Sequence, residues 1–374
     1  MKPQDNLKKF FLWAGILFLA ATIVMIALGA AEGSLGGMVA APVIVLLAFL
    51  VVGVFLLSIT LPYVLPILTT ATLAPLFGFR NWMILLGPLW LQKTPKRWTR
   101  MTGLSGMRCA NFLVTDDERD LAARWIAIKR IAPMTSFLML TAAMVGLLSM
   151  ASLREVGLWN TAFYFTGIFA FGSLVQFVTE LDENGHSARS VIQTLKKGGK
   201  EADWELANLV LNSFASSMPL PRSLDSRWIA IYEDMLLVNP MSHQIRDVLM
   251  SYYHDIGDSG RFEEHRTMVL NLLPSLLKQP KDINVYNLIW YAAIGSAVED
   301  EARRLYAQIA PADPALEPSR FWLEAEIARK AGRFDEARKW ATDAAAGYRK
   351  SDQESGYTNA YPLAQIEKLI QSLP

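Results

Sequence analysis

The chain has 374 residues, of which 52% are hydrophobic and only 19% are charged. It is too apolar for an ordinary soluble protein, and its net charge of +1 gives no reason to expect a nucleic-acid partner. The single cysteine, Cys109, excludes an internal disulfide and a zinc site built from several cysteines, and an inert thiol is expected there. Long apolar runs come before residue 180, which predicts a membrane domain followed by a soluble domain.

Residues 1–9 are polar and carry three lysines, and residues 10–31 form an uncharged apolar run. A run of about 22 residues is long enough to cross the hydrocarbon core of a bilayer. It is also longer than the apolar part of a secretory signal peptide, so we expect an anchor that is not cleaved. The lysines predict a cytoplasmic N-terminus.

Residues 38–79 form a second apolar run, about twice as long as one span requires. Its second half contains three prolines: Pro62, Pro66 and Pro75. Either 38–60 spans the membrane and 61–79 is a broken or re-entrant continuation, or 61–79 is a separate span. The segment 80–133 is basic, which favours the cytoplasm. An even number of spans should therefore precede it, and one kinked element over 38–79 is expected.

Spans three and four are expected within 134–179, over 134–153 and 158–178, with a very short outer loop between them. Neither apolar interior contains an ionisable residue, which argues against a pump or a secondary transporter. The chain is therefore predicted to be an integral protein of the inner (plasma) membrane of a bacterium, with both termini in the cytoplasm. The basic residues at 92–108 are explained as a topology signal rather than as a lipid-binding site.

Residues 180–227 are expected to form a linker and the first soluble helices, because apolar residues recur at helical spacing from residue 201. The pattern Gly-Arg-Phe-acid-Glu occurs at 260–264 and again at 332–336. Ala302 and Ala337 are 35 positions apart, close to the period of tetratricopeptide repeats. We therefore expect tetratricopeptide-like helical repeats over 228–374, with Gly in the turns and small residues where helices touch.

Within these repeats, core packing explains most aromatic residues of the first helices better than a groove for a partner. The residues of this possible partner groove are Tyr252, Tyr253, Tyr286, Trp290 and Phe321. His254 and His265 are expected at the surface of the repeats rather than in a metal site with Asp255 or Asp258. No HExxH, GxSxG, phosphate-binding glycine loop or CxxC motif occurs in the chain.

The layout of residues 38–225 has several features in a characteristic order. They are an apolar helix ending at Gly78-Phe79-Arg80, a Gly87-Pro88-Leu89 turn, a basic segment, a span starting at Pro133, the stretch Asn184-Gly185-His186 and the segment PLPRSLD at 219–225. This layout resembles the site-2 protease family of intramembrane zinc metallopeptidases. The stretch at Asn184 resembles the Asp-Gly segment of that family, and 219–225 resembles the linker to helical repeats in some bacterial members.

In that family a helical HExxH supplies two zinc ligands and a glutamate that activates water, and a later Asp supplies a third ligand. Counted back from Gly78, the HExxH position reads Pro66-Ile67-Leu68-Thr69-Thr70, and the Asp position reads Asn184. The resemblance therefore implies a degenerate metal site at Pro66, Ile67, Thr70 and Asn184. No catalytic residue, no metal and no other cofactor is expected, because these side chains cannot act as a general base near neutral pH.

The expected fold is all-α: a polytopic membrane bundle of about four spans, followed by a cytoplasmic helical-repeat domain. A short sheet is allowed in the 80–115 segment, with strand pieces at 83–86 and 113–114. The leading hypothesis is a non-catalytic adaptor or scaffold in the lipid bilayer whose repeats bind a protein or peptide partner. One alternative is an active intramembrane zinc metalloprotease with displaced ligands at Asp182, Glu183 and His186. The second alternative is a transporter component.

Overall fold

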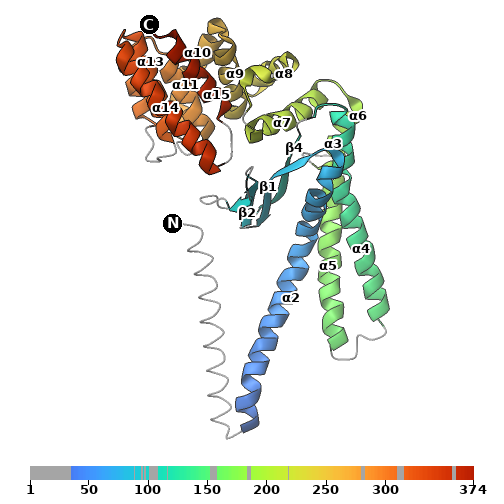
Figure 1. Ribbon diagram of the computed structural model, residues 1–374. Coiled ribbons are helices and arrows are strands. Elements are labelled where there is room, and N and C mark those ends of the chain that lie inside the picture. The colour runs from blue at the N-terminus through green and yellow to red at the C-terminus, as the bar shows by residue number, and fades with distance from the viewer. Residues whose placement is uncertain are drawn as a thin grey trace. The chain divides into compact units, whose positions relative to one another are not determined.

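The protein is described here by a computed structural model (Figure 1). It describes residues 35–87, 89–93, 96, 98–100, 108–115, 117–151, 158–182, 187–217, 219–278, 283–309, 316–355 and 359–374. The chain forms two compact units, which divide between Gly198 and Gly199, with Thr94–Arg97 grouped with the second. We call them the N-terminal unit and the C-terminal unit. The expected span at 10–31 lies outside the described residues.

Helix α2 (Leu35–Leu73) is one continuous helix of 39 residues, and the 3₁₀ helix η1 (Ala74–Phe77) follows it. At 1.5 Å per residue such a helix is about 58 Å long, nearly twice the thickness of a hydrocarbon core. It continues through Pro62 and Pro66, so the chain forms one long element here and not a separate span over 61–79.

Two further apolar helices pack against α2: α4 (Ile131–Met150) and α5 (Leu158–Leu181). The short helix α3 (Leu121–Lys129) leads into α4. Figure 1 shows α2, α4 and α5 side by side. Among the described residues, three stretches are long and apolar enough to cross a membrane: Gly53–Phe77, Leu121–Met150 and Asn160–Leu181. By length and composition they are those of a membrane protein.

Gly172 of α5 allows this helix to approach α2 closely. A Cβ atom at Gly172 would lie only 2.9 Å from Cγ of Pro62. We expect Gly172→Leu to push the two helices apart and to lower the stability of the bundle by about 1–3 kcal/mol. The measurement is unfolding of the purified full-length protein by increasing dodecyl sulfate.

Gly53→Leu is the matched control, because no atom of the residues that the structure describes lies within 4 Å of a Cβ at Gly53 of α2. An equal loss of stability in both variants would show that leucine itself, and not the contact with Pro62, causes the effect.

A four-stranded antiparallel sheet follows α2. Its strands are β1 (Arg80–Gly87), β2 (Leu89–Lys93), β3 (Trp98–Arg100) and β4 (Arg108–Val114), in the order β3-β2-β1-β4. Leu86 faces Leu89 across β1 and β2, which places a hairpin at the expected turn. The strands include both expected strand pieces and extend well beyond them. The chain is therefore predominantly helical, as expected, with this sheet inserted between α2 and α3.

The junction at Gly78 binds the end of α2 to the sheet and to α3. Gly78 has a φ of +74°, and a Cβ atom there would lie 2.5 Å from Nη1 of Arg124. Arg124 Nη1 donates to the carbonyl oxygen of Phe77 at 3.3 Å, and Thr115 Oγ1 donates to that of Gly78 at 3.0 Å. The ring of Phe79 packs 5.5 Å from that of Trp125. These contacts hold the sheet beside the end of α2.

The amphipathic helix α6 (Ala188–Lys197) ends the N-terminal unit and packs against α3 and α5. The C-terminal unit begins with α7 (Lys200–Ser217), η2 (Pro221–Ser223) and α8 (Ser226–Val238). Three helical hairpins and one last helix follow: α9 (His243–Ile256) with α10 (Ser259–Leu276), α11 (Ile283–Gly295) with α12 (Glu299–Ala307), α13 (Glu317–Lys330) with α14 (Phe334–Ser355), and α15 (Ala360–Ser372).

The two sequence copies of Gly-Arg-Phe differ in the conformation of their glycines. Gly332 lies in the turn between α13 and α14 with a φ of +74°, as the repeat pattern predicts. Gly260 instead lies inside α10, and the turn before it is made at Gly257, with a φ of +77°. The expectation that Gly260 makes the turn is wrong, because Asp258 caps α10 by accepting from the Arg261 N–H at 3.0 Å.

Candidate functional site

The α2 positions that the resemblance to site-2 proteases singles out line a cleft of about 270 Å³ in the N-terminal unit, with both polar and apolar walls. Pro66, Ile67 and Thr70 lie in the α2 wall, together with Tyr63. The other walls come from β4, α3, the start of α4, the end of α5 and the first residue of α6. We call this site the α2–β4 cleft. The α2–β4 cleft lies where the end of the long apolar helix meets the sheet.

Asn184, the remaining degenerate position, lies outside the described residues. Glu180 and Ala188, which flank it in the sequence, both line the α2–β4 cleft. The tertiary structure therefore brings Glu180 and Ala188 to the same cleft as Pro66 and Thr70, although more than a hundred residues separate them from α2 in the chain.

Glu180 is the carboxylate of this cleft that sequence reasoning missed. Its Oε1 accepts from Gln176 Nε2 at 3.0 Å, and its Oε2 accepts from the backbone N–H of Ala188 at 3.3 Å. The second bond places a negative charge at the N-terminus of α6, where the helix dipole stabilises it. Glu180 therefore links α5 to α6. The sequence feature that could have identified Glu180 is its position at the end of the fourth apolar run, four residues before Asn184.

The α2 wall does not fit a zinc ion. Thr70 Oγ1 donates to the carbonyl oxygen of Pro66 at 2.7 Å, and Thr69 Oγ1 donates to that of Leu65 at 2.8 Å. Pro66 and Ile67 offer no ligand atom, whereas zinc in a catalytic site takes imidazole nitrogens and carboxylate oxygens. In the part of the chain that the structure describes, no group of three or more His, Cys, Asp or Glu side chains lies together.

The sheet wall offers hydrogen-bonding groups. Asn111 of β4 donates from Nδ2 to Asn81 Oδ1 at 2.9 Å, and Asn81 Nδ2 donates to the carbonyl oxygen of Ala71 at 2.7 Å. Oδ1 of Asn111 is buried and has no hydrogen-bond partner among the described residues. β4 is the last strand in the sheet order, so one of its edges pairs with no other described strand. A strand edge of this kind can accept an added strand.

The aromatic residues considered for a partner groove are mostly in the core of the C-terminal unit. Tyr253, Tyr286 and Trp290 are buried, whereas Tyr252 and Phe321 are partly exposed. The indole N–H of Trp290 donates to the carbonyl oxygen of Ser319 at 2.9 Å. Core packing thus accounts for the three buried residues.

The expectation that His265 lies at the surface is wrong, and His254 is only partly exposed. His265 is buried, with Nε2 3.1 Å from Glu233 Oε1 and Nδ1 3.3 Å from Nη1 of Arg246. A guanidinium only donates, so Nδ1 accepts and the Nε2–H donates to Glu233. His254 Nδ1 accepts from the hydroxyl of Tyr361 at 2.7 Å. The buried ring of His265 is tolerated because both of its nitrogens have partners, and the hydroxyl of Tyr361 satisfies Nδ1 of His254.

Comparison of the chain with protein-family models, with curated proteins and with solved structures finds no match. The features from which a function can be inferred are therefore the α2–β4 cleft, the apolar helices and the helical hairpins.

Proposed function

We propose that this protein is a non-catalytic, site-2-protease-like membrane adaptor or scaffold. It holds an extended peptide segment of one partner in the α2–β4 cleft and binds a protein partner with its tetratricopeptide-like repeats. One observation carries the proposal: the positions matched to the zinc ligands line a cleft, but they are Pro66, Ile67 and Thr70. A cleft of this kind can hold a substrate-like segment, and the three α2 positions supply no side chain that could hydrolyse it.

The dimensions and the walls of the α2–β4 cleft favour a peptide over a small molecule. Its volume of about 270 Å³ is below the roughly 300–1,000 Å³ of typical small-molecule sites. A peptide needs room there for only a few side chains, because it can continue along the strand beyond the cleft. The open edge of β4 supplies main-chain donors and acceptors for such a segment.

The C-terminal unit supports the second binding role. Its three consecutive hairpins resemble a repeat array, and arrays of this kind bind proteins and peptides. Leu237 and Val238, at the end of α8, are 80% and 64% exposed, and Met241 beside them is 42% exposed. An apolar patch on a soluble surface is typical of a protein-binding site. We place both termini in the cytoplasm of a bacterial inner-membrane protein, because basic residues cluster in 80–133.

A photo-activatable cross-linker at Ile67 of the full-length protein in its own membrane tests the cleft. The expected product is a covalent adduct with an intact partner protein, cross-linked through an extended segment. The control is the same cross-linker at Leu56 of α2, whose side chain is 52% exposed on the apolar helix. Adducts of equal yield from Leu56 and Ile67 would contradict a specific peptide site.

A protease with displaced ligands is the second candidate, because Glu180 lies in the cleft and the stretch Asp182, Glu183 and His186 follows it. The proposal predicts no stoichiometric zinc in purified full-length protein after dialysis against a weak chelator. It also predicts that Glu180→Gln leaves the partner uncleaved, as in the unsubstituted protein. Stoichiometric zinc that is lost in His186→Ala, together with partner cleavage that is lost in the same variant, would establish the protease instead.

A further inference from the structure

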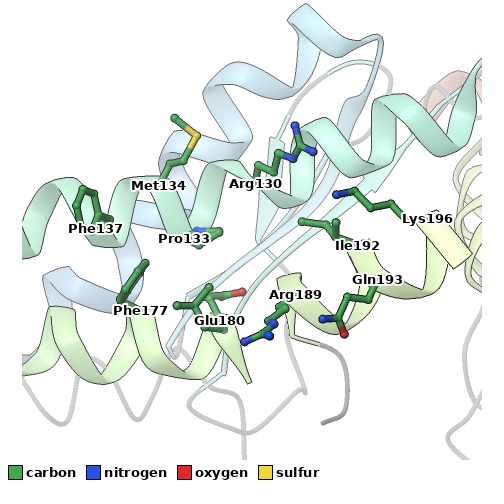
Figure 2. Close-up of a pocket in the computed structure, with 11 residues that line it drawn as sticks. Arg130, Pro133, Met134, Phe137, Phe177, Glu180, Arg189, Ile192, Gln193 and Lys196 are labelled. Atoms are coloured by element: carbon green, nitrogen blue, oxygen red, sulfur yellow. The ribbon is translucent and has the colours of Figure 1, made fainter. Parts of the chain in front are cut away.

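The N-terminal unit contains a second cavity. Glu180 lines both this cavity and the α2–β4 cleft, and the other lining residues of the two differ. It has a volume of about 500 Å³ and lies between α4, α5 and α6. Figure 2 shows its two different ends. Phe137 and Phe177 lie at one end, and Arg130 and Lys196 lie at the other.

The apolar end opens sideways on the bundle. Met134 and Phe137 are 61% and 52% exposed, although they belong to a stretch that is long and apolar enough to cross a membrane. The rings of Phe137 and Phe177 are 5.6 Å apart and form an apolar wall. An exposed apolar wall on a membrane-spanning helix faces lipid chains rather than water, so a hydrocarbon chain can enter the cavity from the bilayer.

The polar end carries an excess of positive charge. Three cations line it, Arg130, Arg189 and Lys196, against one carboxylate, Glu180, which gives 3 − 1 = +2. Glu180 already accepts from Gln176 and from the backbone of Ala188. Within the described part of the chain, the side chains of Arg130 and Lys196 have no hydrogen-bond or ion-pair partner. The excess charge therefore favours an anionic group over a neutral or zwitterionic one.

The cations also lie at the depth where a headgroup would be. Arg130 directly precedes α4, Arg189 and Lys196 lie on α6, and α5 ends at Leu181 just before α6 begins. These are the positions where apolar helices leave the hydrocarbon region. Guanidinium and ammonium groups at this level bind phosphate oxygens of lipid headgroups.

We propose that this cavity binds one anionic glycerophospholipid taken from the bilayer. Its phosphate lies among Arg130, Arg189 and Lys196, and an acyl chain lies against Phe137 and Phe177. Bound in this way, the lipid packs between α4, α5 and α6, and it supports the position of α6 beside the α2–β4 cleft. This site goes beyond the proposed adaptor function and does not depend on it.

The test measures lipid binding to the purified full-length protein by native mass spectrometry. The protein is equilibrated in mild detergent with equal amounts of phosphatidylglycerol and phosphatidylcholine that have the same acyl chains. We expect one phosphatidylglycerol to be bound in preference to phosphatidylcholine. Removing the three cations should weaken phosphatidylglycerol binding roughly 100-fold, at about fivefold for each cation. The substitutions are Arg130→Gln, Arg189→Gln and Lys196→Gln.

The matched control removes three exposed cations from the C-terminal unit: Lys278→Gln, Lys350→Gln and Lys368→Gln. It should bind phosphatidylglycerol as the unsubstituted protein does. The double variant Arg130→Lys with Arg189→Lys keeps the positive charge, so it should still prefer phosphatidylglycerol to phosphatidylcholine. This result would show that loss of charge, and not substitution of these residues as such, causes the weaker binding of the Gln variant.

Three results would overturn the proposal. They are equal binding of the two lipids, unchanged binding by the triple Gln variant, and displacement of the lipid by glycerol phosphate at the same concentration as by free phosphatidylglycerol. The last result would assign the site to a free phosphate compound, because the acyl chain would then contribute nothing.

Discussion

Acidification from about pH 7 to about pH 4.5 is expected to remove roughly 2–3 kcal/mol of unfolding free energy from the C-terminal unit through His254 alone. The ring of His254 is enclosed by the rings of Phe262, Tyr291, Trp322 and Tyr361, at centroid distances of 5.5, 6.1, 6.2 and 6.2 Å. Burial among these rings lowers the pKa of His254 from 6.5 to about 4. The nearby carboxylate of Asp255 opposes that shift, and Lys368 and Lys330 add to it.

The direction of the effect follows from the lowered pKa of His254. The folded unit favours the neutral ring, whereas the unfolded chain takes up a proton near pH 6.5. The stabilisation is therefore complete above that pH, and it is lost as the pH falls from 6.5 toward 4. Protonation would also place a positive charge at Nδ1, which accepts the Tyr361 hydroxyl, and so would break that hydrogen bond.

The measurement is urea unfolding of the detergent-solubilised full-length protein at both pH values, followed by tryptophan fluorescence and compared with His254→Phe. The variant loses the hydrogen bond to Tyr361, which costs about 1 kcal/mol at either pH. Carboxylates contribute equally to both proteins, so the difference between the two pH dependences isolates His254. If the two proteins lose the same free energy on acidification, His254 is not the acid-sensitive group.

Asp255→Ala is expected to lower the unfolding free energy of the C-terminal unit by about 3 kcal/mol. The side chain of Asp255 is 0% exposed. It accepts from the backbone N–H of Arg222 at 2.9 Å and from Nε2 of Gln365 at 2.8 Å, and Nη1 of Arg222 lies 3.9 Å away. One carboxylate on α9 thus joins η2 to α15, the last helix of the unit. Alanine leaves both donors without their acceptor in the interior.

Asp255→Ala is also expected to destabilise α15 locally, in addition to lowering the unfolding free energy of the whole C-terminal unit. Hydrogen exchange should speed up first in α15, because Gln365 loses the bond that holds this helix to α9. Glu367→Ala is the matched control, since this carboxylate of α15 pairs with Arg349 at 3.2 Å while both side chains are more than half exposed. Exposed pairs contribute little to stability. Similar losses in both variants would contradict the role assigned to Asp255.

Sequence reasoning predicted part of the candidate site and missed the rest for a physical reason. Pro66, Ile67 and Thr70 were chosen by counting back from Gly78, as the family resemblance implies, and residues at this spacing on one helix share a face. Glu180 and Asn111 reach the same cleft from α5 and β4. Whether these two residues reach the cleft depends on how α2, the sheet and α5 pack together, and no local sequence pattern indicates that packing.

By itself, the sequence determined the apolar helices and the helical hairpins. An uncharged run must span or be buried, since lipid cannot solvate charge, and a repeated pattern such as that at 332–336 repeats a local hairpin. Only the tertiary structure decided that His265 is buried and that aromatic rings surround His254. It also decided that the turn lies at Gly257 and that four strands pair between α2 and α3. These outcomes depend on partners distant in the chain: Tyr361 and Glu233 satisfy the two rings, and β4 completes the sheet.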